Sequence, residues 1–196
     1  TSFSGIGQGW EADGGVSSRS GYFRGQNYTV LCWNINTFKR FQDMTRILFV
    51  CHGNICRSPM GEFIMKNLVK SAGLETEFDI ASAATSSEET GNPVYPAARR
   101  KLAEYGIGCA GKTARQLTAE DYNRYDLLIG MDQANLRNMR RICGGDPDGK
   151  IGLLLDYAGR SEDVADPWYT GDFDAAWRDI DAGCRGLLDR LRKTAP

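Results

Sequence analysis

One short run combines a cysteine, an arginine and a glycine-containing turn in a spacing that could hold an anion and attack it. The run reads Cys51-His52-Gly53-Asn54-Ile55-Cys56-Arg57-Ser58-Pro59. Ser58 followed by Pro59 predicts a helix start, because the hydroxyl can cap the helix and proline tolerates its first position. The backbone amides before this helix can curl inward as a nest for a phosphate. Gly53 permits the positive φ that a tight cradle requires, and Asn54 tolerates it.

Cys51 lies at the base of this nest, where the amides that attract an anion also stabilise a thiolate. We therefore expect Cys51 to act as a nucleophile at neutral pH without a histidine base. Arg57, at the other lip, carries a planar fork that matches two phosphate oxygens. His52 is the only histidine in the chain, and we assign it to the pocket rim rather than to catalysis.

The elements that must position this loop follow a regular alternation from Arg46 onward. Short apolar runs alternate with segments of helical spacing, which is typical of a parallel sheet covered on both faces. The predicted strands are 46–50, 78–83, 126–131 and 151–155, and the predicted helices are 59–71, 96–105, a segment capped by Asp132 and 173–191. We expect a single α/β domain with a doubly wound four-stranded parallel sheet and helices on both faces. Its ligand should bind beyond the carboxyl ends of the strands.

The loop closely resembles the signature of the low-molecular-weight protein tyrosine phosphatases. Further segments match that family in order: Ala81-Ser82-Ala83-Ala84-Thr85-Ser86, Gly91-Asn92-Pro93, Ala114-Arg115-Gln116, Met131-Asp132 with Asn135-Leu136, and Asp166-Pro167-Trp168-Tyr169. The resemblance covers roughly residue 45 to the end of the chain. It implies a cysteine-dependent phosphatase domain over residues 44–196.

The resemblance also implies an activity and three catalytic residues. The protein would hydrolyse phosphotyrosine through a phosphocysteine on Cys51, while Arg57 binds the phosphate. Asp166 would protonate the leaving phenolate. A carboxyl group suits this task because a tyrosine oxygen, with a pKa near 10, leaves poorly without a proton. The expected partners are phosphotyrosine-containing proteins, with phosphate as product or inhibitor.

The pocket around the phosphate is expected to favour a flat aromatic ester. The predicted substrate-binding residues are His52, Gly53, Asn54, Ile55, Cys56, Ser58, Trp168 and Tyr169. Ile55 would fill the space beside the phosphate, and the rings of Trp168 and Tyr169 would flank a phenyl ring. As in the family, Cys56 would form a reversible disulfide with Cys51 that protects the thiolate from overoxidation; loop packing is the alternative role.

Other roles are implied by the resemblance, and two positions depart from it. Ser58 would hydrogen-bond the thiolate, and Asn54 would hold the loop through a polar network that reaches Ser82. Glu88 stands where family members from animals carry an aromatic side chain, so it is expected on the pocket wall. Tyr105 stands where some relatives have a histidine that supports the network, so Asn54 is expected to be held differently.

Three other functions compete with this interpretation. A thiol-dependent arsenate reductase needs two further cysteines in a later mobile segment, and residues 121–131 contain none. A protein arginine phosphatase carries threonine at the position of Ile55. A noncatalytic phosphate-binding module is disfavoured because nucleophile, clamp and acid are all present.

Composition limits the classes of partner. The 24 Lys and Arg residues nearly balance 25 Asp and Glu residues, which gives no support to a broad surface for nucleic acid or anionic membranes. No apolar run approaches the roughly 20 residues needed to span a bilayer. The six cysteines lack the spacing of a zinc site, and neither a metal nor a cofactor is expected. We expect a soluble, cytoplasmic monomer.

Residues 1–43 differ from the rest of the chain. They are rich in Gly and Ser at first and lack apolar periodicity, so we interpret them as an irregular leader that need not be native. A short strand is predicted at 28–33. Met44 is a candidate natural start, because the periodic pattern begins directly after it.

Overall fold

The computed structural model describes residues 44–194. All of them belong to one compact unit, Lys39–Pro196. The predicted leader, its short strand at 28–33 and Cys32 lie outside the described residues. Within the described part of the chain, no helix is long and apolar enough to cross a membrane.

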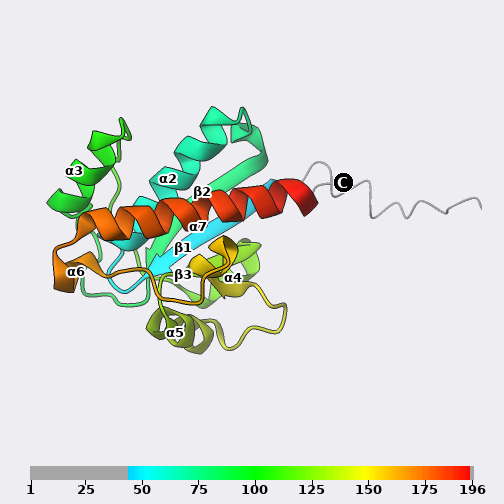
Figure 1. Ribbon diagram of the computed structural model, residues 1–196. Helices are drawn as coiled ribbons and strands as arrows, with labels where there is room; N and C mark the ends of the chain where they lie inside the picture. Colours follow the sequence, from blue (N-terminus) through cyan, green and yellow to red (C-terminus); the bar gives the residue numbers. More distant parts are fainter. Residues whose placement is uncertain (1–43, 195–196) are drawn as a thin grey trace, which may run out of the picture. The chain divides into compact units, whose positions relative to one another are not determined.

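Four parallel strands form the sheet, in the order β2-β1-β3-β4 (Figure 1). The strands are β1 (Thr45–Cys51), β2 (Phe78–Ala84), β3 (Leu127–Gly130) and β4 (Ile151–Leu153). This confirms the predicted sheet and its strands, with β3 and β4 shorter than expected. Cys51 is level with Ala84 on β2, and Val50 is level with Gly130 on β3. The carboxyl ends of these strands therefore meet at one edge, where the loop after β1 begins.

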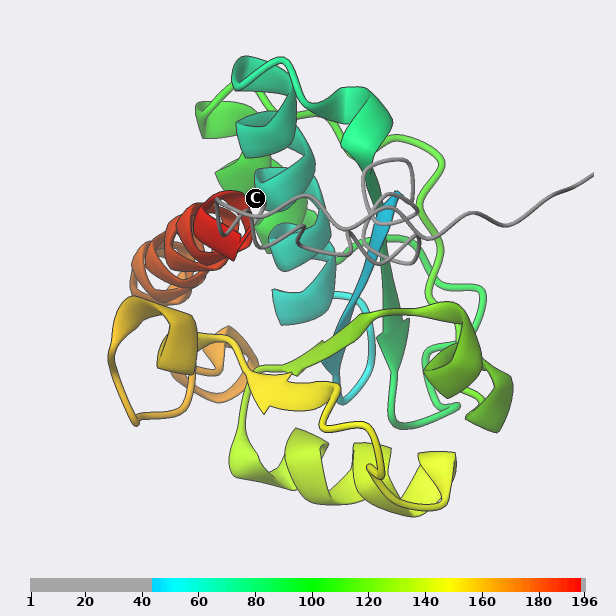
Figure 2. The ribbon, with the colours of Figure 1, turned by 90° about the vertical axis from the view of Figure 1, so that its right-hand side faces the viewer.

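Helices cover both faces of the sheet, as the doubly wound pattern predicted. The helices are α2 (Arg57–Ser71), α3 (Pro96–Glu104), α4 (Ala119–Arg124), α5 (Gln133–Cys143), α6 (Pro167–Thr170) and α7 (Phe173–Thr194), with short 3-10 turns η1 (Glu75–Glu77) and η2 (Leu155–Ala158). In β1, Ile47 and Phe49 join the core under α2 and α7, whereas Leu48 and Val50 join the core under α4 and α5. Figures 1 and 2 show α2 and α7 on one side and α5 on the other.

The last helix packs its apolar stripe into the core, as predicted. Ile180, Cys184 and Leu187 are fully buried. Glycine at position 186 allows α7 to approach η2, because a Cβ there would lie 2.1 Å from the carbonyl oxygen of Tyr157. This close contact holds the start of the long segment between η2 and α6. Among the other cysteines of the described part, Cys109 is buried as expected, whereas Cys143 is only partly buried.

Three local predictions need correction. The short helices α4 and α6 were missed, because four to six residues are too few for a periodic signal. Helix α2 begins at Arg57, one residue before the predicted cap Ser58, and no side chain caps it. By contrast, Asp132 caps α5 as predicted, since its carboxylate accepts a hydrogen bond from the amide of Asn135.

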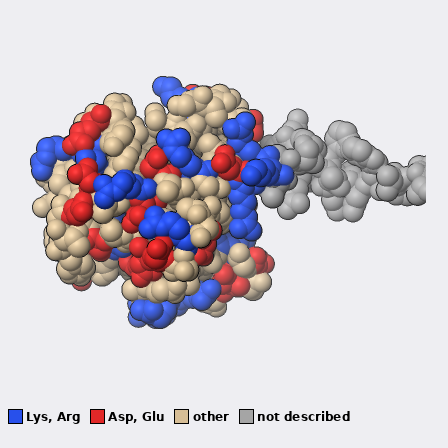
Figure 3. Space-filling view, in the orientation of Figure 1, with Lys and Arg blue, Asp and Glu red and all other residues tan. Residues whose placement is uncertain are grey.

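The surface carries both signs of charge in close mixture. Figure 3 shows Lys and Arg interspersed with Asp and Glu over the face that it presents. Ion pairs at the surface include Arg185 with Asp181 and Arg160 with Glu162.

Candidate active site

The loop between β1 and α2 is held in its curled form by Asn54. Its φ of 57° makes it the one non-glycine residue with a positive φ among residues 44–194. The sequence predicted a positive φ at Gly53, but the structure has it at Asn54. At Gly53 the space is tight instead, because a Cβ there would lie 3.1 Å from Cγ of Glu89, whose side chain would have to shift slightly. Asparagine tolerates this conformation better than most residues.

Cys51 lies at the floor of the pocket, where β1 ends. Its sulfur accepts a hydrogen bond from the backbone amide of Asn54 at 3.3 Å. The Ser58 hydroxyl lies 3.0 Å from the same sulfur. Ser58 thus faces the cysteine rather than the helix end, which explains why its predicted role as an N-cap is wrong and why its implied contact with the cysteine is present.

Arg57 is buried beside Cys51 and held by two carboxylates. Its Nη1 donates to Asp132 at 2.8 Å, and its Nη2 donates to Asp166 at 2.5 Å. Burial by itself disfavours the charged guanidinium, but the negative charges of Cys51, Asp166 and Asp132 outweigh it and raise the pKa of Arg57. The arginine therefore remains a permanent cation at the base of the pocket.

Asp132 was predicted only as a helix cap and was missed as a site residue. One carboxylate oxygen caps α5, and the other accepts from Arg57. Helix α5 follows β3, so Asp132 lies at the same sheet edge as the loop. The signal that could have found it was its position directly after a predicted strand, where ligand-binding residues gather in α/β sheets.

Asp166 reaches the pocket from the segment before α7. Its Oδ1 accepts a hydrogen bond from the amide of Trp168 at 3.0 Å, so the carboxylate caps the short helix α6. Its Oδ2 receives the hydrogen bond from Arg57. The two contacts hold the carboxyl group within the pocket, about 27% exposed at its side chain.

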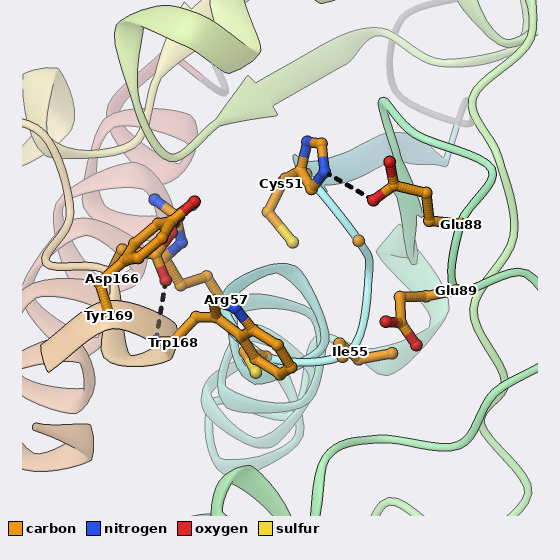
Figure 4. A pocket seen from close by; sticks show the side chains of 11 residues that line it. Cys51, Ile55, Arg57, Glu88, Glu89, Asp166, Trp168 and Tyr169 are labelled. Atoms are coloured by element: carbon orange, nitrogen blue, oxygen red, sulfur yellow. Dashed lines mark hydrogen bonds and ion pairs between the residues drawn. The ribbon is translucent and has the colours of Figure 1, made fainter. Parts of the chain in front are cut away.

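The pocket has an aromatic side and an acidic side, as Figure 4 shows. Trp168 and Tyr169 stand with Asp166 on one side, and Glu88 and Glu89 stand opposite, with Ile55 below. The cavity measures about 220 Å³. Of the predicted substrate-binding residues, His52, Gly53, Ile55, Cys56, Trp168 and Tyr169 line this pocket, and Glu89, which the sequence reasoning had not identified, lines it too. Asn54 and Ser58 do not line it, because both are fully buried.

The aromatic side extends beyond the predicted residues. Tyr95 meets the ring of Trp168 edge to face, with centroids 5.5 Å apart, and stacks against Phe173 at 6.1 Å. Such pairs prefer offset or edge contacts, which fix the Trp168 ring at the pocket edge.

The acidic side is attached to the loop through the backbone. The amide of Ser86 donates to the carbonyl of His52, and the amide of Tyr95 donates to the carbonyl of Ile55. These bonds hold the segment between them, which carries Glu88 and Glu89, against the pocket. Glu88 lies on the wall as expected and is 3.2 Å from Nε2 of His52. Both side chains are well exposed, so His52 occupies the rim, in keeping with its predicted place.

Cys56 is buried, lines the same pocket and is a free thiol, like the other cysteines of the described part. Burial and the nearby negative charge of Cys51 raise the pKa of Cys56 to about 12. Cys56 is therefore protonated at neutral pH, whereas Cys51 lies among hydrogen-bond donors. The two thiols of the loop have opposite environments.

The polar network implied for Asn54 is present. Its Nδ2 donates to the hydroxyls of Ser58 and Ser82, each at 2.8 Å. Tyr105 takes no part in it, because its ring stacks on Trp177 with centroids 3.8 Å apart. Asn54 is thus held without the histidine that some relatives use.

Comparison with known proteins agrees with this geometry. The family model described as low molecular weight phosphotyrosine protein phosphatase matches residues 46–196. The low molecular weight protein-tyrosine-phosphatase YfkJ of Bacillus subtilis is 39% identical over 152 residues, which cover 76% of this chain and 97% of YfkJ. Its crystal structure aligns with a TM-score of 0.76 over 79% of this chain and 98% of that chain.

Two further relatives show the breadth of the similarity. A low molecular weight phosphotyrosine protein phosphatase of Schizosaccharomyces pombe is 41% identical over 129 residues, covering 64% of this chain and 82% of the relative. The structure of a Drosophila arginine phosphatase is 30% identical, with a TM-score of 0.69 over 74% of this chain and 97% of that chain. From the extent of these matches, the chain belongs to the low molecular weight phosphotyrosine protein phosphatase family.

Proposed function

We propose that this protein hydrolyses phosphotyrosine in proteins, with Cys51 as nucleophile, Arg57 as phosphate clamp and Asp166 as proton donor. One observation carries the assignment. The sulfur and the guanidinium come from the loop after β1 and the carboxyl group from a segment 109 residues beyond Arg57, and all three line the same cavity of about 220 Å³. A nucleophile, a cation and a proton donor within one pocket are what the cleavage of a phosphate monoester requires.

The first step is attack by the Cys51 thiolate on phosphorus, which forms an S–P bond as the P–O bond to the phenol breaks. Arg57 and the loop amides bind the phosphoryl oxygens while their charge is redistributed. Asp166 enters this step in its protonated form, which the second step regenerates. It transfers the proton to the phenolic oxygen, so the electron pair of the broken bond leaves on a neutral phenol. The first step thus yields phosphocysteine and an ionised Asp166.

The second step restores the enzyme. A water molecule attacks the phosphorus, and the Asp166 carboxylate accepts its proton as the S–P bond breaks. The thiolate leaves as a good leaving group, because the amide of Asn54 and the hydroxyl of Ser58 stabilise its charge. Phosphate is released and should compete with substrate for the same clamp.

The wall residues support phosphotyrosine as the preferred substrate. Ile55 lines the pocket and is otherwise buried against Cys56 and Ala114. Its apolar surface suits a phenyl ring, and it would leave the N–H groups of a phosphoguanidinium unpaired. Trp168 and Tyr169 offer rings on which the phenyl group can rest.

We further propose that residues 44–196 form the catalytic domain and act as a monomer in the cytoplasm. The family match over 46–196 supports this boundary. The free thiols of the described part suit a reducing compartment, in which structural disulfides are rare.

The experiment that tests the function measures kcat/KM for a phosphotyrosine peptide, phosphoarginine and arsenate in metal-free buffer. We expect turnover of the peptide to dominate. Cys51→Ser should abolish turnover while its circular dichroism matches wild type, because the serine hydroxyl is not ionised near neutral pH but fits the same loop. Appreciable residual activity of Cys51→Ser would remove Cys51 as the nucleophile.

A further inference from the structure

The segment that carries the proposed acid has no regular structure of its own. Residues 160–166 lie between η2 and α6 and form neither a helix nor a strand. The backbone groups of such a segment must find their hydrogen-bond partners on other elements. The contacts that the segment makes with those elements therefore set the position of Asp166.

A single peptide group shortly before the acid is held at both ends. Its carbonyl oxygen, on Val164, lies 3.4 Å from Nη1 of Arg57. Its N–H group, on Ala165, donates to Oδ2 of Asp179 at 3.1 Å. Because this peptide group lies one residue before Asp166, its orientation limits the directions in which the Asp166 side chain can point.

Asp179 holds the segment from α7, whose neighbouring residue Ile180 is fully buried in the core. The Asp179 side chain is 15% exposed, and both of its oxygens accept hydrogen bonds. Oδ2 accepts from Ala165, and Oδ1 accepts from Nη1 of Arg160 at 2.9 Å. One carboxylate on a packed helix therefore holds the segment at its first residue and again directly before the acid.

The ion pair of Arg160 with Asp179 serves orientation more than stability. The Arg160 side chain is 40% exposed, and ion pairs at the surface contribute little to the free energy of unfolding. The amide of Arg160 donates to the carbonyl of Leu155 at 3.0 Å, which fixes this residue to η2. Since Arg160 occupies Oδ1 of Asp179, the other oxygen is turned toward the amide of Ala165.

The proposed reaction increases the demand on this support. Arg57 contacts both Asp166 and the carbonyl of Val164, and in the reaction it must also bind the phosphate. Asp179 does not line the pocket, so a bound phosphate does not compete for it. A displacement of about 1 Å at a catalytic group can lower a rate about 10²-fold, so a support that is independent of the substrate has a direct effect on proton transfer.

We propose that Asp179 is a positioning residue for the proton donor Asp166 and that Arg160 orients the Asp179 carboxylate. This inference rests on the proposed function, in which Asp166 protonates the leaving group. Asp179 touches neither the substrate nor the reacting atoms. It acts on Asp166 through the peptide group between Val164 and Ala165.

The test measures kcat/KM of each variant for a phosphotyrosine peptide and for p-nitrophenyl phosphate. Nitrophenolate leaves readily without a proton, whereas a tyrosine oxygen, with a pKa near 10, does not. Asp179→Ala removes the acceptor of the Ala165 amide. We expect the ratio of kcat/KM for the peptide over that for p-nitrophenyl phosphate to fall about tenfold, because a displaced acid slows only the substrate that needs its proton. Arg160→Met leaves this hydrogen bond in place and should lower the ratio by a smaller factor, about threefold.

Two controls separate positioning from a general loosening of the fold. Asp181→Ala removes an acid of the same helix that pairs with Arg185 and makes no contact with the segment. Its ratio should equal that of wild type. The second control is Asp179→Ala in an Asp166→Asn background, where we expect no further change of the ratio because the group that Asp179 positions no longer carries a transferable proton. The melting temperature establishes that each variant is folded.

The outcomes distinguish this inference from the proposed function. If Asp166→Asn keeps the wild-type ratio, the proton-donor role in the proposed function fails. If Asp166→Asn lowers the ratio but folded Asp179→Ala keeps it, or slows both substrates equally, the positioning role is refuted while the function stands. If Asp179→Ala does not fold, Arg160→Met decides, and an unchanged ratio in that variant refutes the inference.

Discussion

The Asp166 carboxylate lies 2.5 Å from Nη2 of Arg57, although 109 residues separate them in the chain. The proposed acid and the proposed clamp are therefore direct partners. Asp132 accepts a hydrogen bond from Nη1, the other terminal nitrogen of the same guanidinium. The two contacts together fix the plane of the guanidinium. A phosphate that approaches Nη2 competes with Asp166 for this nitrogen. We infer that substrate binding itself releases the Asp166 oxygen that must face the leaving group.

The proposed role of Asp166 predicts that its substitution lowers kcat by an amount that depends on the leaving group. Asp166→Asn keeps the side-chain oxygen that caps α6 but removes the transferable proton. We expect kcat for a phosphotyrosine peptide to fall by about 10² to 10⁴, the usual share of general acid catalysis. The fall should be smaller for an aryl phosphate with an activated leaving group. Equal losses on both substrates would argue against the proton-donor role.

The contact between Asp132 and Arg57 predicts weaker phosphate binding when the charge of Asp132 is removed. Asp132→Asn can still cap α5, because asparagine is among the best N-cap residues. We expect inhibition by inorganic phosphate to weaken about tenfold, with the thermal melt nearly unchanged. The single amide oxygen of the variant caps α5, so an N–H group replaces the oxygen that accepts from Arg57 and the charge-assisted hydrogen bond is lost. The control is Asp163→Asn, since Asp163 accepts from Gln133 at the same helix start without touching Arg57. Equal phosphate inhibition in Asp132→Asn and wild type would remove the orienting role.

The contrast between the two loop thiols predicts an order of oxidation. Cys51 should react first with peroxide, and Cys56, a neutral thiol at neutral pH, should then close a disulfide onto it. We expect dithiothreitol to restore peroxide-treated wild type but to leave peroxide-treated Cys56→Ser inactive. Equal recovery of both proteins would show that Cys56 only packs the loop. Mass spectrometry of the oxidised peptide identifies the product.

The raised pKa of Cys56 predicts a loss of stability in alkali. The unfolded thiol ionises above about pH 9, whereas the folded thiol ionises near 12, so the folded state binds more protons between these values. The free energy of unfolding should therefore fall as pH rises from 9 to 12, by at most about 1.4 kcal/mol per pH unit for this group. Urea unfolding across this range should show a shallower fall in Cys56→Ala. Parallel curves for the two proteins would contradict the assignment.

The position of Ile55 predicts a change of substrate preference. Ile55→Thr removes apolar surface from the pocket and adds a hydroxyl that can pair with a guanidinium. We expect the ratio of kcat/KM for phosphotyrosine over phosphoarginine to be high in wild type and to decrease in the variant. The two substrates should be measured with both proteins under one condition. A wild type that already prefers phosphoarginine would overturn the substrate assignment, although the phosphatase chemistry could stand.

The sequence alone determined the parts of this protein that depend on neighbouring residues. The strands, the long helices and the loop from Cys51 to Arg57 are local patterns, because apolar periodicity and short spacings express the geometry of one segment. The single-segment signals failed at the short helices α4 and α6 and at the hydroxyl of Ser58. The helices α4 and α6 are too short for a periodic signal, and the role of Ser58 depends on the cysteine beside its hydroxyl.

The tertiary structure decided which distant residues share the site. Asp132 lies 75 residues from Arg57 in the chain, and neither the residue types nor their spacing predicts a contact between them. The same holds for Glu89 on the pocket wall and for Lys112, which meets Glu62 behind the loop. Such contacts follow from the strand order β2-β1-β3-β4 and from the packing of helices on both faces of the sheet. Non-local pairing sets these contacts, and a pattern within one segment cannot encode it.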